Sequence, residues 1–291
     1  MSTMPRSQPV DGFQLAYDRS GSGAGVVLLH GWPGDRLDYR DVVAKLGGGA
    51  DVVVPDLRGF GESDRHPVSP EEGYSAGAQA RSIVGLIDEL GLQPAVLVGY
   101  DVGSRVAQAV AKAFPERVRA LVLSPPLPGA GDRVLTPEAQ REFWYQAFHQ
   151  LDLVEEILDG HAEAIRAYIA HFWAHWSGPS FRQSGVDLDR LGSLYALPGA
   201  FSASIAWYRA GSGTVATSLR ELTSDRPQPI SVPTTVLWPE HDPLFPPAWG
   251  DRVNDFFADV TVKQLAGVGH FVPREAPTQI ADAIRAAISG R

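Results

Sequence analysis

The chain has 291 residues, 44% of them hydrophobic, with 34 acidic and 25 basic residues and a formal net charge of −9. It contains no cysteine, which excludes disulfides, thiolate metal sites and a cysteine nucleophile. The acidic balance and the lack of a basic run argue against nucleic acid or an anionic membrane as a partner. The first nine residues hold no apolar signal region and no run approaches 18 apolar residues, so we expect a cytoplasmic protein.

The first part of the chain alternates short apolar runs with helical patterns. The apolar runs predict buried parallel strands because they are short, rich in β-branched residues and apolar on both faces. These runs are GVVLLH (25–30), DVVVPD (51–56), AVLVGY (95–100) and RALVLS (119–124). Apolar residues at helical spacing predict helices over 78–91 and 104–117. The alternation predicts an α/β fold with a doubly wound, mostly parallel sheet.

The alternation is interrupted in the middle of the chain. A Pro/Gly-rich linker (124–133) leads into an aromatic-rich region with helical periodicity, which a second linker (224–233) ends. The alternation then resumes with strands at 234–238 and 260–265 and helical stretches at 247–257 and 277–288. We therefore predict a core formed by residues 1–128 and 231–291 and a helical cap formed by residues 129–230.

The stretch GYDVG (99–103) places an aspartate between two glycines, after a strand and before a helix. So tight a turn needs small neighbours, and it exposes its central side chain beside a helix N-terminus. Asp101 is therefore a candidate nucleophile. The alternative is that Asp101 only caps the helix that follows.

Two residues in the last third of the chain complete a triad in the order nucleophile, acid, histidine. Asp242 and His270 each follow a predicted strand, so both belong to the carboxyl edge of the sheet. His270 could take a proton from water while Asp242 orients its ring. The alternatives are a turn aspartate before proline and an ordinary surface-loop histidine.

The stretch HGWPG (30–34) follows the first core strand. A turn there can direct the backbone N–H of Trp32 into the site, and the N–H of Val102 would be a second donor, which together form an oxyanion hole. The alternative is an ordinary Gly/Pro turn.

In combination these motifs resemble the α/β-hydrolase fold superfamily over almost the whole chain. The matching residues are His30-Gly31-x-Pro33, DLRGFGES (56–63), GYDVG (99–103), Asp242 and His270. The resemblance implies an α/β-hydrolase fold with a helical cap inserted into a mostly parallel sheet.

An aspartate in place of the usual serine selects a different electrophile. Attack on an acyl carbon would give an anhydride, whereas attack on an sp3 carbon gives an alkyl-enzyme ester that water can hydrolyse. Epoxides and organohalides are the two obvious substrate classes. Tyr145-Gln146 and Trp207-Tyr208-Arg209 resemble the two cap tyrosine motifs of epoxide hydrolases, so Tyr145 and Tyr208 are the expected acids for ring opening. The alternative is that both are ordinary aromatic core residues.

The resemblance thus favours an epoxide hydrolase acting through Asp101, His270 and Asp242 on an apolar epoxide and water. The residues expected to line the substrate pocket are Trp32, Gln146, Trp173, Leu244 and Phe271. No cofactor and no metal are expected, since His171 and His175 lack a third ligand nearby. The sequence leaves the oligomeric state open, a homodimer included.

Two other functions remain open from the sequence. One is a hydrolytic dehalogenase with the same triad, acting on a haloalkane or haloacid; Val102 argues against it, because haloalkane dehalogenases typically carry a halide-binding Trp there. Fluoroacetate dehalogenases pair the nucleophile with two arginines, of which only Arg105 is present. The more remote alternative is a ligand-binding protein of the same fold that has lost catalysis.

Overall fold

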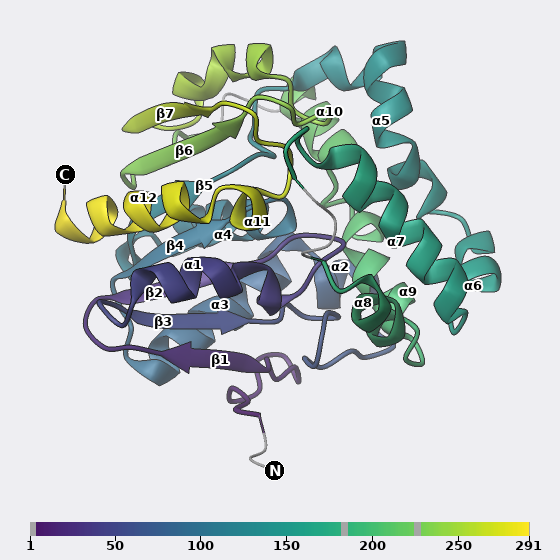
Figure 1. Ribbon diagram of the computed structural model, residues 1–291, viewed down its shortest axis with the longest axis horizontal. Coiled ribbons are helices and arrows are strands. Elements are labelled where there is room, and N and C mark those ends of the chain that lie inside the picture. The colour runs from purple at the N-terminus through teal and green to yellow at the C-terminus, as the bar shows by residue number, and fades with distance from the viewer. Residues whose placement is uncertain (1–3, 182–185, 224–227, 291) are drawn as a thin grey trace.

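The computed structural model describes residues 4–181, 186–223 and 228–290. Its centre is a seven-stranded sheet with the order β1-β3-β2-β4-β5-β6-β7 (Figure 1). β1 is antiparallel to β3, and every other neighbouring pair is parallel. The predicted fold class, a mostly parallel doubly wound sheet with a helical insertion, is confirmed.

All six predicted strands are present. The strands are β1 (Tyr17–Ser20), β2 (Gly25–Leu29), β3 (Asp51–Pro55), β4 (Ala95–Gly99), β5 (Val118–Leu123), β6 (Thr234–Pro239) and β7 (Val260–Leu265). The sequence analysis missed β1, because this edge strand exposes three of its four residues and has no apolar run to reveal it.

Helices cover both faces of the sheet. In Figure 1, α1 (Arg40–Leu46) and α12 (Pro277–Ser289) lie in front, and α3 (Ala76–Leu90) and α4 (Val102–Ala113) lie behind. Short elements join them: η1 (Arg36–Tyr39), α2 (Pro70–Tyr74), η2 (Pro115–Arg117), η5 (Pro247–Asp255) and α11 (Val272–Glu275). The helix predicted over 104–117 ends earlier, because Pro115 disfavours helical backbone at Phe114. The predicted stretch 247–257 is a 3-10 helix, and α1 was not predicted.

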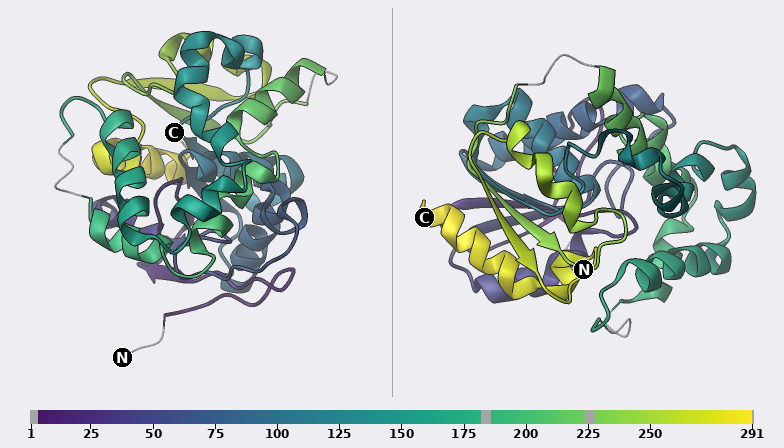
Figure 2. Two further views of the ribbon diagram at one scale, coloured as in Figure 1. Left: turned by 90° about the vertical axis from the view of Figure 1, so that its right-hand side faces the viewer. Right: turned by 90° about the horizontal axis from the view of Figure 1, so that it is seen from above.

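A helical insertion separates β5 from β6. It contains η3 (Gly131–Leu135), α5 (Pro137–Phe148), α6 (Leu153–Leu158), α7 (Ala162–Trp176), α8 (Leu188–Tyr195), α9 (Ala200–Arg209) and α10 (Thr214–Thr223). The insertion lies beyond the carboxyl ends of the parallel strands (Figures 1 and 2). Of the predicted second linker, residues 224–227 lie outside the described residues.

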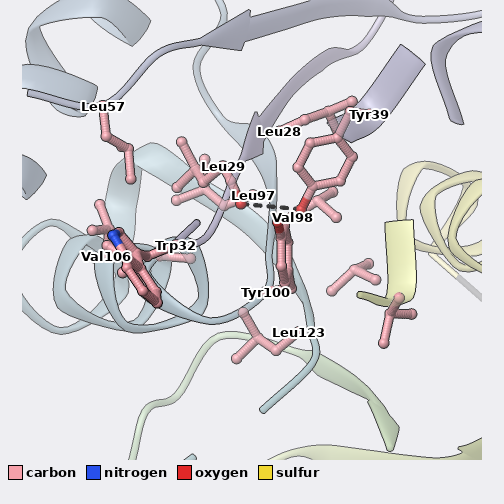
Figure 3. Packing of buried hydrophobic residues seen from close by; sticks show 14 of the residues in the cluster. Leu28, Leu29, Trp32, Tyr39, Leu57, Leu97, Val98, Tyr100, Val106 and Leu123 are labelled. Carbon is pink, nitrogen blue, oxygen red and sulfur yellow. Dashed lines mark hydrogen bonds between the residues drawn. The ribbon is translucent and has the colours of Figure 1, made fainter. Parts of the chain in front are cut away.

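The loop after β2 joins the insertion to the sheet. The Trp173 indole N–H of α7 donates to the Pro33 carbonyl at 3.1 Å, and the Tyr195 hydroxyl of α8 donates to the Gly34 carbonyl at 2.9 Å. Most of the buried hydrophobic side chains form one cluster that continues from the sheet into the insertion. Figure 3 shows its sheet side, where Trp32 lies near residues of β2 and β4 and the Tyr39 hydroxyl binds the Leu29 carbonyl. The loop carrying HGWPG is thus one of the contacts between the two parts.

Within the described part of the chain, no helix is both long and apolar enough to cross a membrane.

Candidate active site

Asp101 occupies a sharp turn between β4 and α4. Its backbone has φ 48° and ψ −123°, which is rare for a residue with a Cβ atom and typical of strained functional turns. Its carbonyl accepts the N–H groups of Ser104 and Arg105, so it occupies the N-cap position of α4. Its side chain makes no capping hydrogen bond. The carboxylate is therefore not used as an ordinary helix cap.

The flanking glycines are required by close backbone contacts. A Cβ atom on Gly99 would lie 2.4 Å from the carbonyl carbon of Gly103, and one on Gly103 would lie 2.0 Å from the carbonyl oxygen of Leu29. A Cβ atom on Gly31 would lie 2.5 Å from the Cβ of Asp101. Because real Cβ atoms do not approach so closely, the small residues around Asp101 follow from the geometry of the turn.

Two backbone N–H groups bind the Asp101 carboxylate. The N–H of Trp32 donates to Oδ2 at 2.7 Å, and the N–H of Val102 also donates to the carboxylate. These are the two donors that the sequence analysis predicted for an oxyanion hole. In this structure they hold the carboxylate of Asp101.

His270 and Asp242 face Asp101 from the loops after β7 and β6. The His270 Nδ1 lies 2.9 Å from Asp242 Oδ2, and its Nε2 lies 3.9 Å from Asp101 Oδ1. All three side chains are buried. Asp242 accepts at one ring nitrogen and so leaves the other facing Asp101, the geometry of a nucleophile, base and orienting acid.

Burial and charge act in opposite directions on this triad. Burial raises the pKa of Asp101 above its ordinary value, although the charge of His270 and the N–H groups of Trp32 and Val102 oppose it. Burial lowers the pKa of His270, but the charge and hydrogen bond of Asp242 outweigh that effect and raise it above its ordinary value. Asp242 and Asp101 thus stabilise an imidazolium at this position.

Tyr145 of α5 and Tyr208 of α9 lie together on the insertion side of the site. Their rings are perpendicular, with centroids 5.6 Å apart, and their hydroxyls interact through a hydrogen bond. Both contact Trp32: Tyr145 stacks on it at 5.7 Å and Tyr208 meets it edge-on at 6.1 Å. Burial raises the pKa of each tyrosine well above its ordinary value, with the charge of Asp101 among the other causes. Both hydroxyls therefore remain protonated and lie within electrostatic range of Asp101.

The remaining predicted pocket residues have different surroundings. Gln146 contacts Tyr145, to whose hydroxyl its side chain donates at 3.1 Å. Trp173 and Phe271 stack on each other at 3.7 Å, and the Trp173 indole is already bonded to Pro33. Leu244 is buried, and its N–H donates to Asp242 Oδ1 at 2.9 Å, so its backbone fixes the acid.

Three further residues of the site were not predicted from the sequence: Trp176 and His149, which are buried, and Glu275, which is half-buried. Trp176 lies 5.1 Å from His270 and 5.3 Å from Tyr145 between ring centroids, so it bridges the triad and the tyrosines. His149 contacts Tyr208 at 4.9 Å. His149 could have been found from the sequence because it lies one helical turn after Tyr145. Trp176 likewise lies one helical turn after Trp173.

Glu275 is the third missed residue. Its carboxylate accepts the N–H groups of Gly178 and Gly269 at 2.8 Å and of Phe271 at 3.1 Å. These bonds join the His270 loop to the end of α7. No local sequence motif predicts this contact, because the three N–H donors come from two segments that are far apart in the chain, the end of α7 and the His270 loop.

Nothing in residues 4–181, 186–223 and 228–290 groups three or more metal-ligating side chains. His175 instead lies 2.7 Å from Glu142, and its ring stacks on His171 at 5.8 Å.

Comparisons with known proteins agree with this architecture. The family model for the alpha/beta hydrolase fold matches residues 26–157. The soluble epoxide hydrolase of Corynebacterium sp. strain C12 is 27% identical over 281 residues, covering 94% of this chain and 93% of that protein. Haloalkane dehalogenase 2 of Mycobacterium bovis is 26% identical over 280 residues, covering 93% and 90%.

Solved structures show the same fold. An epoxide hydrolase from Bacillus megaterium, crystallised with its diol product, superposes with a TM-score of 0.81 at 21% identity, covering 99% of this chain and all of the other. The CorEH epoxide hydrolase, solved without ligand, gives a TM-score of 0.81 at 23% identity, with 99% of both chains covered.

The fold, the turn geometry and these similarities define the class: the chain has the α/β-hydrolase fold. Within it, the protein is a hydrolase similar to epoxide hydrolases and, at nearly equal identity, to haloalkane dehalogenases.

Proposed function

We propose that the protein is an epoxide hydrolase that forms a covalent ester on Asp101. The observation that carries this proposal is a pair of buried tyrosines packed on Trp32, whose N–H binds the Asp101 carboxylate, with both hydroxyls within electrostatic range of that carboxylate. Ring opening produces an alkoxide, which needs a proton, whereas a departing halide needs none. A tyrosine that remains protonated can supply that proton. The helical insertion acts in this proposal as the cap that holds the tyrosines over the nucleophile.

In the first step, the Asp101 carboxylate attacks one carbon of the epoxide. The new ester C–O bond forms as the ring C–O bond breaks, and the electron pair of the broken bond goes to the ring oxygen. A tyrosine hydroxyl donates its proton to that oxygen, leaving a hydroxyl group on the substrate.

In the second step, water attacks the carbonyl carbon of the Asp101 ester. His270 takes a proton from this water, and Asp242 stabilises the resulting imidazolium. The N–H groups of Trp32 and Val102 stabilise the oxyanion of the tetrahedral intermediate. Its collapse releases the diol as His270 returns the proton to the departing oxygen.

A hydrolytic dehalogenase is the second candidate, and one observation favours it. The Trp32 indole N–H is buried and has no hydrogen-bond partner among the described residues, so it could donate to a halide. Val102 supplies no second donor of this kind. Arg105 donates to the Leu127 carbonyl at 3.2 Å and lies 3.9 Å from Glu221, so its position does not favour a haloacid clamp.

A single turnover in ¹⁸O-water tests the covalent mechanism. With enzyme in excess over a styrene-type epoxide, the first diol should carry ¹⁶O from the Asp101 carboxylate, because water enters at the carbonyl carbon rather than at the substrate. A first diol with one ¹⁸O atom from water beside the ¹⁶O of the epoxide would rule the ester out, whereas the ester mechanism gives a first diol with no ¹⁸O.

The substrate class is tested with a panel of aryl, aliphatic and polycyclic epoxides beside fluoroacetate and a bromoalkane. The proposal expects diol from at least one epoxide. Halide release without diol formation would identify the dehalogenase, and ligand binding with no turnover of any substrate would indicate a non-catalytic protein.

A further inference from the structure

The hydroxyl oxygen of Tyr145 accepts a hydrogen bond from its neighbour in the sequence. The side-chain amide of Gln146 donates from Nε2 to Tyr145 Oη at 3.1 Å. Both side chains are buried, with 2% and 7% of their surfaces exposed. Water therefore has little access to compete for this contact.

The orientation of the Gln146 amide is fixed by helix α10. The backbone N–H of Val215 lies 3.1 Å from Gln146 Oε1, and a backbone N–H can only donate. Val215 belongs to the first turn of α10, where N–H groups have no partner within the helix. A flipped amide would leave that N–H facing another donor, so Nε2 must face Tyr145.

Close packing holds the amide in this position. A Cβ atom on Gly213 would lie 2.7 Å from Gln146 Oε1 and 2.9 Å from the Tyr208 ring, so the loop before α10 packs against both side chains. The amide therefore has little freedom to rotate away.

The two tyrosines consequently have unequal roles. The Tyr145 oxygen accepts from Gln146, and the Tyr208 hydroxyl is also hydrogen-bonded to it. These bonds lower the pKa of Tyr145, against the larger effect of burial, whereas the bond to Tyr145 raises the pKa of Tyr208. With its oxygen accepting from Gln146, Tyr145 keeps its own hydrogen available to donate.

We propose that Gln146 is a positioning residue that makes Tyr145, rather than Tyr208, the proton donor to the opening epoxide. This inference rests on the proposed epoxide hydrolase function. When Tyr145 gives its proton to the ring oxygen, its phenolate accepts from the Gln146 amide and the Tyr208 hydroxyl. Ester hydrolysis leaves the second hydrogen of the attacking water on the Asp101 carboxyl. That proton returns to Tyr145, which restores both groups.

A double-mutant cycle on ester formation tests the assignment. Gln146→Glu keeps an acceptor for Val215 but removes the donor to Tyr145. We expect it to slow single-turnover ester formation about 30-fold, in the range of a lost general-acid interaction. Hydrolysis of the preformed ester should change less than about threefold, because that step needs no tyrosine proton.

The cycle is completed in two backgrounds. In Tyr145→Phe, Gln146→Glu should have no additional effect, because its target hydroxyl is gone. In the Tyr208→Phe background, Gln146→Glu should still slow ester formation by its full factor. The opposite pattern, with the effect absorbed by Tyr208→Phe, would overturn the inference. With epoxides that bear a nitro-substituted aryl group, Gln146→Glu should slow ester formation less than with the parent substrate, because their more stable alkoxide depends less on a proton donor.

Gln150, in the turn that follows α5, offers a second glutamine as a control. Its amide donates to the Tyr208 backbone carbonyl at 3.0 Å and does not contact either hydroxyl. Gln150→Ala should retain ester formation within about threefold, since it removes only a contact between helices. Gln146→Met is the second variant if Gln146→Glu does not fold, with thermal melting as the folding check.

The outcomes separate the two proposals. If wild type forms no ester from any epoxide, the proposed function fails and the inference fails with it. If wild type and Gln150→Ala form the ester, and Gln146→Glu forms it at the same rate as Gln150→Ala, the proposed function stands and only the inference about Gln146 fails.

Discussion

The turn that carries Asp101 and the aromatic face that carries Tyr145 and Tyr208 are built by different means. The turn is defined by backbone: a positive φ, two N–H donors and glycines at positions where a Cβ atom would collide. The aromatic face is defined by side chains of α5, α7 and α9 packed around Trp32. A backbone-defined site is specified by a short stretch of sequence, whereas a side-chain-defined site depends on how distant helices dock.

The largest expected effect is on the turn itself. Asp101→Ala should lower diol formation by on the order of 10³-fold or more, because no other group of the site can form the ester. Intact-protein mass spectrometry after substrate addition should show no adduct, whereas His270→Gln should accumulate one. Glu138→Ala, at an exposed position of α5, is the control and should keep wild-type activity. An Asp101→Ala enzyme with substantial activity would remove the carboxylate from the mechanism.

Adding one methyl group tests whether backbone packing defines the turn. Gly103→Ala should lower the free energy of unfolding by about 3 kcal/mol, because the new Cβ atom would collide with the Leu29 carbonyl. Gly77→Ala is the control in α3, where the nearest atom is the Arg81 guanidinium at 4.0 Å. That control should be neutral or more stable by up to about 1 kcal/mol. Equal stabilities in urea denaturation would contradict the prediction.

Removing hydroxyls from the aromatic face should affect rate more than stability. Tyr145→Phe should slow ester formation by about 10²-fold and Tyr208→Phe by about tenfold, since the first loses the donor and the second only its support. Thermal melting should change little, because both rings keep their packing. A loss of stability as large as that of Gly103→Ala would mean that the hydroxyls hold the helices together.

The smallest expected effect is the dependence of the rate on pH. It should differ between the step that depends on His270 and the step that depends on the two tyrosines. His270 must be neutral to activate water, and its pKa is raised, so the turnover rate should fall as pH decreases through a value above 6.5. Both tyrosine pKa values lie well above 10, so the rate should not fall on the alkaline side up to about pH 10. Stopped-flow measurement of ester hydrolysis against pH checks the first statement, and ester formation against pH checks the second. A fall in ester formation between pH 8 and 9 would contradict the assignment of the tyrosines as buried acids.

The two regions also differ in how well the sequence predicted them. The strand–turn–helix pattern around GYDVG and the loop after β2 predicted the turn that carries Asp101 and the two N–H groups found on its carboxylate, because each depends on residues close in the chain. The edge strand β1 lacks an apolar pattern and was missed, and so was α1. Trp176 and Glu275 were missed as site residues because their partners lie in other segments.

The sequence by itself determined which polar residues follow which strands: a carboxylate at a constrained turn, and then an acid and a histidine at the ends of later strands. Short-range sterics and hydrogen bonding require those residue types at those positions, so a short stretch of sequence is enough to predict them. Only the tertiary structure decided that the Gln146 amide donates to the Tyr145 hydroxyl, since the orientation of that amide depends on a Val215 N–H at the start of α10, 69 residues away along the chain. A hydrogen's direction is set by all the donors and acceptors around it, and folding alone brings these together.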